Sequence, residues 1–168
     1  RARLAEGDLT ERVVHDSAGT GDWHAGQPPD RRAIACAAGH GVDIADLRAR
    51  QLTLADFERF DALLCADRDN LRDVRALAPP GLRDRVRLLS DFAHGMQESI
   101  PDPYTGGAED FERVWAMVDA MAQAIVEQVR TRWDRFLGQV AHAAHRDGAE
   151  RGGVGGPGAG GERSVTAR

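Results

Sequence analysis

The apolar residues of this chain fall into several short runs and one long periodic stretch. From Glu109 onward an apolar side chain recurs every three or four positions, as Phe111, Val114, Val118, Met121, Ile125, Val129, Trp133, Phe136 and Val140. This spacing places the apolar side chains on one face of an α-helix. We therefore predict one long helix that begins near Glu109 and packs a single face on a sheet.

Three short runs have the length and composition of β-strands, at 12–15, 61–66 and 85–89. The run Asp61-Ala62-Leu63-Leu64-Cys65-Ala66 is compact, apolar and bounded by charged residues, which is typical of a buried strand. These strands alternate with predicted helices. The alternation predicts an α/β domain with a parallel sheet and right-handed crossovers.

The helices between the strands are marked by their end signals. The helix predicted at 31–38 stops at the glycine signal Gly39-His40-Gly41. A short helix at 53–60 begins with Thr53 and Asp56 in a capping-box spacing. A third helix at 67–77 ends before Pro79-Pro80-Gly81, and Asp67 is expected to be its N-cap.

Composition fits one globular domain with an appendage. The chain has 168 residues, of which 42% are hydrophobic and 29% charged. After about Arg146 the sequence is rich in glycine and nearly free of apolar residues. We predict a folded domain over residues 1–145 and a disordered tail over 146–168.

Net charge and cysteine content limit the partners and the cellular location that we expect for this chain. A net charge of −5 and a pI near 5.7 disfavour nucleic acid or an anionic membrane as the main partner, because both require a basic surface. The chain has two cysteines, Cys36 and Cys65, too few for a disulfide scaffold, and it has no apolar run of signal-peptide or membrane-span character. The expected location is a reducing cytoplasm.

The segment Asp102-Pro103-Tyr104 carries the first candidate chemistry. Pro103 has a fixed φ and pushes Asp102 toward an extended backbone, so that a carboxyl group and an aromatic ring share one stiff loop. Considered alone, the tripeptide favours an ordinary proline turn before a helix over a functional site.

Six separated motifs, taken together, carry a resemblance to a family. They are Ser17-Ala18-Gly19-Thr20-Gly21-Asp22-Trp23-His24, His40-Gly41-Val42, Arg48-Ala49-Arg50-Gln51, Asp56-Phe57, Asp67 with Asn70-Leu71-Arg72-Asp73, and Asp102-Pro103-Tyr104. In order and spacing they resemble the low-molecular-weight protein tyrosine phosphatases. The resemblance implies a three-layer α/β sandwich around a small parallel sheet, and hydrolysis of phosphotyrosine proteins through a phosphocysteine intermediate, without a metal or other cofactor.

The same resemblance assigns three site residues. The family's general acid falls on Asp102, and the aromatic walls of its phosphotyrosine slot fall on Trp23 and Tyr104. The assignment is chemically reasonable, because a tyrosyl leaving group with a pKa near 10 needs a proton from a positioned acid. Aromatic walls would favour an aryl phosphate over a phosphoserine.

One departure from the family concerns the nucleophile. The family's C-x5-R loop follows its first, central strand, but position 42 after Cys36 is Val42, and position 71 after Cys65 is Leu71. We therefore expect a chain truncated at its N-terminus, without the central strand and inactive by itself. Smaller departures are Leu47, where a histidine is frequent, and Thr105, where a second tyrosine is usual.

The missing central strand leads to a structural expectation. The strands at 12–15 and 61–66 should stand either two ladder spacings apart, about 9.6 Å, or pair directly at about 4.8 Å. Unpaired strand edges should also make the isolated chain poorly folded.

Two alternatives to a truncated tyrosine phosphatase remain open from the sequence. A non-catalytic pseudophosphatase would retain Trp23 and Tyr104 as a binding module. An arsenate reductase of the same fold is disfavoured, because it needs further redox cysteines near Cys65. A metal site is not expected, because His15, His40, His94 and the two cysteines do not form an H-x3-H or C-x2-C motif, and the pair His142 and His145 is expected to be solvated.

Overall fold

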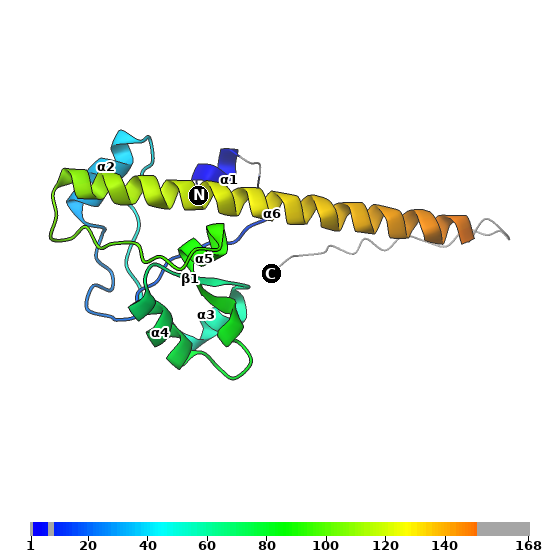
Figure 1. Cartoon of the computed structure of the whole chain (residues 1–168), viewed down its shortest axis with the longest axis horizontal. Coiled ribbons are helices and arrows are strands. Elements are labelled where there is room, and N and C mark those ends of the chain that lie inside the picture. Colours follow the sequence, from blue (N-terminus) through cyan, green and yellow to red (C-terminus); the bar gives the residue numbers. More distant parts are fainter. Residues whose placement is uncertain (1, 7–8, 151–168) are drawn as a thin grey trace.

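The computed structural model describes residues 2–6 and 9–150, and side chains as far as residue 132. The elements in chain order are α1 (Ala2–Glu6), α2 (Arg31–Gly39), α3 (Leu54–Arg59), β1 (Leu63–Cys65), α4 (Arg68–Leu77), the 3-10 helix η1 (Arg83–Arg85), β2 (Val86–Leu88), α5 (Leu89–His94) and α6 (Ala108–Glu150) (Figure 1). The predicted helices are confirmed. Residues 146–150 belong to α6, and the remainder of the predicted tail lies outside the described residues.

Local capping explains where the helices begin and end. The Asp30 carboxylate accepts the Arg32 backbone N–H at 2.7 Å, and the Asp67 carboxylate accepts the Asn70 N–H at 2.7 Å, so each satisfies a free donor of a first turn. Beyond α2, Gly41 has φ +74°, a left-handed conformation that favours glycine.

The sheet is small and parallel, as predicted. β1 pairs with β2 in the register Leu63 to Val86, Leu64 to Arg87 and Cys65 to Leu88. Both strands are apolar at most positions because helices cover them, as is typical of a parallel strand pair. Within the described ranges β1 forms a ladder only with β2.

The prediction of a strand at 12–15 is wrong. Leu9 accepts the backbone N–H groups of Arg12 and Val13 in a turn, and Val14 is exposed and outside any ladder. An extended segment becomes a strand only when a neighbour satisfies its backbone groups, and no described strand lies beside this one. The direct pairing of this segment with β1 at one ladder spacing is therefore not formed. The parallel contact of this part of the chain is a single bridge, Gly19 to Gln51.

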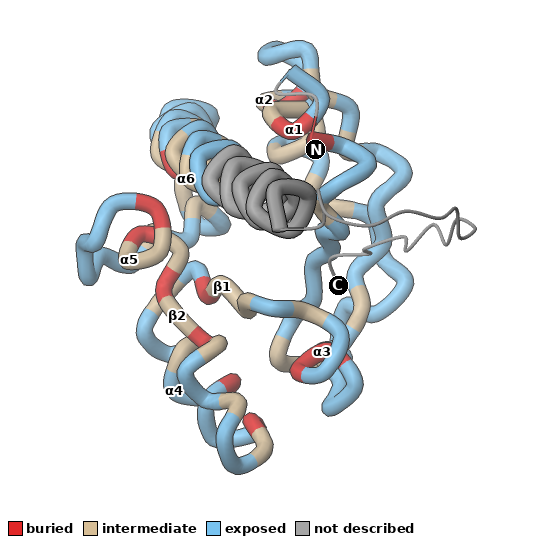
Figure 2. Tube along the Cα trace, turned by 90° about the vertical axis from the view of Figure 1, so that its right-hand side faces the viewer, coloured by how far each residue is buried: buried red, intermediate tan, exposed pale blue. Residues whose placement is uncertain are grey.

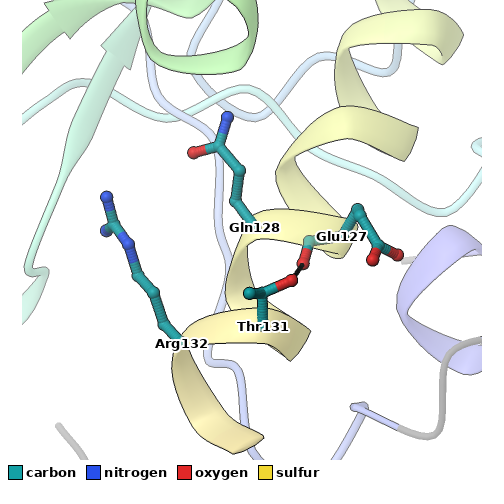
Figure 3. Close-up of a pocket in the computed structure, with 4 residues that line it drawn as sticks. All are labelled: Glu127, Gln128, Thr131 and Arg132. Atoms are coloured by element: carbon teal, nitrogen blue, oxygen red, sulfur yellow. Dashed lines mark hydrogen bonds between the residues drawn. The ribbon is translucent and has the colours of Figure 1, made fainter. Parts of the chain in front are cut away.

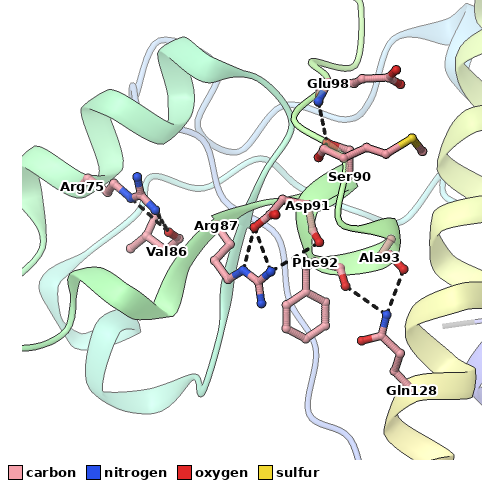
Figure 4. A network of polar contacts seen from close by, with 10 residues as sticks. Arg75, Val86, Arg87, Ser90, Asp91, Phe92, Ala93, Glu98 and Gln128 are labelled. Carbon is pink, nitrogen blue, oxygen red and sulfur yellow. Dashed lines mark hydrogen bonds and ion pairs between the residues drawn. The ribbon is translucent and has the colours of Figure 1, made fainter.

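The core lies where α3 and α4 meet the two strands. Its buried members are Phe57, Cys65, Val74, Ala78 and Val86, and Figure 2 shows buried positions along these same elements. Arg75 joins α4 to the sheet edge, because its guanidinium donates to the Val86 carbonyl at 2.9 and 3.1 Å (Figure 4).

Helix α6 lies between α5 on one side and α1 and α2 on the other (Figures 1 and 2). The chief neighbours of α6 are α5, α2 and α1, rather than the sheet on which its apolar face was expected to pack. The Gln128 amide donates to the Phe92 and Ala93 carbonyls at 3.0 and 2.9 Å, and Arg3 of α1 pairs with Asp119 at 2.7 Å. None of the helices described has the length and hydropathy that a membrane span requires.

Candidate active site

Asp102 and Tyr104 lie on a loop, residues 96–107, that we call the acid loop. The first anchor of the acid loop is the end of the sheet, where the Ile100 N–H donates to the carbonyl of Ala66, directly after β1. The second anchor is the buried Ser90 hydroxyl of α5, which lies 2.6 Å from the Glu98 carbonyl oxygen and accepts the Glu98 N–H at 3.2 Å (Figure 4). The loop is thus anchored at the carboxyl end of a parallel strand, where ligands bind in open α/β sheets.

Arg32 of α2 holds the other half of the acid loop. Its guanidinium donates to the Tyr104 carbonyl at 2.9 Å and to the Gly106 carbonyl at 3.0 Å. The same group lies 4.7 Å from the centre of the Phe111 ring and pairs with Asp30, whose pKa it lowers to about 2. Gly106 has no room for a side chain, because a Cβ there would lie 2.2 Å from Asp110 Oδ2.

The Asp102 side chain is exposed, and one of its two carboxylate oxygens is hydrogen-bonded. One carboxylate oxygen accepts the Tyr104 N–H at 3.0 Å, a local turn that fixes the side chain to its own loop. The residue helps to line a hollow of about 180 Å³ whose other walls are Pro101, Pro103, Thr105, Gly106, Asp110, Arg113 and Val114. The carboxyl group is therefore accessible to a ligand.

The two predicted aromatic residues are exposed and separate. Trp23 is 73% exposed and Tyr104 is 68% exposed. Trp23 packs on its own loop, since a Cβ at Gly21 would lie 2.1 Å from the indole. In the described part of the chain the structure records no ring contact between Trp23 and Tyr104.

Trp23 belongs to a second loop, residues 17–29, that we call the tryptophan loop. It is tied to residues 49–51 by backbone hydrogen bonds, including the Gly26 N–H to the Ala49 carbonyl at 2.8 Å. That segment is held in turn by Arg50, which makes two hydrogen bonds of 2.9 and 3.0 Å to the buried Asp56 carboxylate. These bonds lower the pKa of Asp56 to about 2.

Neither cysteine is placed as a nucleophile. Cys65 is buried at the end of β1, as predicted, and burial raises its pKa to about 11. Cys36 was expected to be a buried apolar residue but is only half-buried, on α2. Its pKa is raised by partial burial and by a hydrogen bond to Glu112.

Cys36, His40 and Glu112 form a cluster that the sequence analysis missed. His40 Nε2 lies 2.7 Å from Glu112 Oε2, and one donor atom from each of the three residues lies within 4.8 Å of the others. The sequence signal was C-x3-H, which places two side chains one helical turn apart as H-x3-H does. The third member comes from α6 and has no signal in the local sequence.

A second hollow of about 200 Å³ lies on α6 and is lined by Glu127, Gln128, Thr131 and Arg132 (Figure 3). Thr131 bonds the Glu127 carbonyl at 2.9 Å, and Gln128 is used in holding α5. None of the three predicted site residues lines this hollow, so the acid loop remains the better candidate for chemistry.

Comparison with known proteins identifies the family. Residues 1–134 match the family model of low molecular weight phosphotyrosine protein phosphatase. A phosphatase of that name from Sus scrofa is 36% identical over 132 residues, which cover 77% of this chain and 83% of the relative. A low molecular weight protein-tyrosine-phosphatase from Streptomyces coelicolor is 40% identical over 135 residues, which cover 77% of this chain and 81% of the relative.

A solved structure agrees with the sequence matches. The protein tyrosine phosphatase of Entamoeba histolytica, solved with Hepes in its active site, aligns with a TM-score of 0.72 at 27% identity and covers 77% of this chain and 83% of that one. The expected α/β fold with a small parallel sheet is confirmed by this likeness. The chain belongs to the low molecular weight phosphotyrosine protein phosphatase family.

Proposed function

We propose that Asp102 is the general acid and base of phosphotyrosine hydrolysis in this protein. The observation that carries the proposal is the acid loop, which is anchored at the carboxyl end of β1 and exposes the Asp102 carboxyl group at a hollow. A protonated Asp102 gives its proton to the tyrosyl oxygen as the phosphorus–oxygen bond breaks. In the second step the carboxylate takes a proton from the water that attacks the phosphoenzyme.

Tyr104 and Trp23 are proposed to contact the aromatic ring of the substrate. Both rings are exposed, and Tyr104 is two residues from the acid, so a phenyl ring placed against Tyr104 brings its phenolic oxygen toward Asp102. Burial of two exposed rings against a third ring supplies affinity that a phosphoserine cannot use. The proposed substrate is therefore a phosphotyrosine side chain of a protein.

The 168 residues are not expected to hydrolyse an aryl phosphate by themselves. The chain has no cysteine followed by arginine six positions later, and its Cys65 thiol is buried with its pKa raised to about 11. A thiol in that state is not a nucleophile at neutral pH. Turnover of an aryl phosphate that disappears in Cys65→Ser would contradict this expectation.

The role of Asp102 is testable in a chimera. An N-terminal strand and C-x5-R loop of the family's pattern are joined to this chain, and hydrolysis is followed on phenyl phosphate and on p-nitrophenyl phosphate. Asp102→Asn should lower kcat on phenyl phosphate by roughly 10²–10⁴. The loss should be smaller on p-nitrophenyl phosphate, because its leaving group needs less help from an acid.

Glu98→Gln is the matched control, since it removes another carboxyl group of the acid loop whose side chain makes none of the anchoring bonds. It should leave both rates within about twofold of the chimera. Equal losses on the two substrates in Asp102→Asn would remove Asp102 from the acid role.

A non-catalytic phosphotyrosine-binding module is the second candidate. The observation in its favour is that Trp23 and Tyr104 remain exposed in a chain without the nucleophile motif. Calorimetric titration of the 168-residue chain with a phosphotyrosine peptide and its unphosphorylated form separates the two candidates. Binding that requires the phosphate and is lost in Trp23→Ala would favour the module, and equal or absent binding of both peptides would reject it.

A further inference from the structure

We propose that Cys36, His40 and Glu112 form a zinc site that joins α2 to the first turns of α6. The three residues come from two elements that are far apart in sequence and packed together. Their donor atoms, a thiol sulfur, an imidazole nitrogen and a carboxylate oxygen, lie within 4.8 Å of one another. This inference does not depend on the proposed phosphatase chemistry.

The donor set decides the type of metal. A thiolate ligand disfavours Mg²⁺ and Ca²⁺, which prefer oxygen, whereas Zn²⁺ accepts sulfur, nitrogen and oxygen ligands in one tetrahedral site. Three protein ligands leave the fourth position for a water molecule. The half-exposed His40 and Glu112 side chains, 41% and 54% exposed, give the ion a path from solvent.

The geometry is close to that of a tetrahedral site. With zinc bonds of about 2.0–2.3 Å, the ligand atoms should be about 3.4–3.7 Å apart. The observed upper separation of 4.8 Å therefore requires a contraction of about 1 Å, which small side-chain rotations supply. His40 Nε2 and Glu112 Oε2 are now in hydrogen-bond contact at 2.7 Å and need to separate by a similar amount.

The surroundings hold two of the ligands in place. The His40 ring stacks on Trp115 of α6 with centroids 4.7 Å apart and planes 8° from parallel. Cys36 lies one turn before His40 on α2, so that both side chains are on the same side of the helix. Without metal, the Cys36 thiol and the His40 ring are each hydrogen-bonded to the Glu112 carboxylate. With zinc, the Cys36 thiol loses its proton to solvent and the thiolate, imidazole and carboxylate bind the ion.

Such an ion would strengthen the support of the acid loop. Helix α2 also carries Arg32, which holds the Tyr104 and Gly106 carbonyls, and α6 begins directly after that loop. Zinc would thus fix the two helices on which the loop rests, and would stabilise the folded state by mass action.

The test uses the full 168-residue chain, stripped of metal with a chelator and titrated with Zn²⁺ by calorimetry. We expect one zinc ion per chain, and a Kd at least about tenfold weaker in Cys36→Ser, in His40→Phe and in Glu112→Gln. His40→Phe retains a ring to stack on Trp115 and removes only the donor nitrogens. Circular dichroism of each variant checks that the helices are retained.

Two control variants separate this site from other donors of the chain. Cys65→Ser removes the buried thiol, and the double change His142→Gln with His145→Gln removes the other closely spaced histidines; both should bind zinc as the unaltered chain does. With Co²⁺ as the probe, a sulfur-to-cobalt charge-transfer band should form in the unaltered chain and in both control variants, and be absent in Cys36→Ser. Absence of zinc uptake, or loss of binding in a control variant but not in Cys36→Ser and His40→Phe, would overturn the proposal.

Discussion

The acid loop and the tryptophan loop carry the two halves of the candidate site, but they are supported in different ways. The acid loop is tied to regular elements, through Ala66 at the end of β1, Ser90 in α5 and Arg32 in α2. The tryptophan loop is tied to residues 49–51, which are themselves irregular and depend on Arg50 and Asp56. The acid is therefore positioned by helices and the sheet, whereas Trp23 rests on an irregular segment that the Arg50–Asp56 ion pair supports.

The largest expected effect is at that ion pair. Arg50→Ala removes the ion-pair partner of the buried Asp56 carboxylate and leaves it only the hydrogen bonds from Thr53, so we expect the free energy of unfolding to fall by about 3 kcal/mol. Urea unfolding measures the loss. Arg72→Ala is the control, because Arg72 pairs with Asp69 and Asp73 on the surface, and it should cost less than about 0.5 kcal/mol. Equal losses in the two variants would mean that the tryptophan loop does not rest on Arg50.

Lowering the pH should also weaken the support that the Arg50–Asp56 ion pair gives to the tryptophan loop. The pKa of Asp56 is lowered to about 2 in the folded chain, mainly by Arg50, from about 3.9 when unfolded. Its contribution is therefore complete above pH 4 and is lost as the pH falls from about 4 to 2, by about 2 kcal/mol. Unfolding measured along this pH range should give a shallower slope in Arg50→Ala. An unchanged slope would assign the acid sensitivity to other carboxylates.

The acid loop should respond to the loss of its buried hydroxyl. Ser90→Ala removes the group that bonds the Glu98 N–H and leaves that backbone group without its partner, at a cost of about 1–2 kcal/mol. Hydrogen exchange of the loop amides should speed up at Glu98 and Ile100, with no change at Gly19 and Gly26 in the tryptophan loop. Faster exchange in both loops would show that they open as one unit.

The smallest expected effect is at Trp23. Because the side chain is 73% exposed, Trp23→Ala should change the free energy of unfolding by less than about 0.5 kcal/mol, measured by the same urea titration. A loss above about 1.5 kcal/mol would make the indole a structural residue and would weaken its proposed place in the substrate slot.

Predictions from the sequence succeeded where neighbours along the chain decide the structure. Asp67 at a helix start and Gly41 beyond a helix end act within a few residues of their own positions, and both were predicted correctly. The strand at 12–15 failed because strand formation depends on a partner that local pattern cannot supply. Apolar periodicity predicted the long helix, but it could not predict which elements pack against that helix.

The candidate site was predicted by a different route. Asp102, Trp23 and Tyr104 were assigned through resemblance, since the local pattern around Asp102 alone favoured an ordinary proline turn. Arg32 was missed because its contacts to Tyr104 and Gly106 are 72 and 74 residues away in sequence. The Cys36 cluster was missed for the same reason, since Glu112 is 72 residues beyond His40.

The unequal burial of the two cysteines has a practical consequence. Cys65 is only 6% exposed, and its thiolate is scarce at neutral pH, so an electrophilic dye reaches it only when the core opens. Cys36 is accessible enough to be the preferred labelling position, and His40 next to it stacks on Trp115. A maleimide fluorophore on Cys36 would therefore sit near an indole that can quench it. The emission of such a probe would follow separation of α2 from α6 without any engineered cysteine.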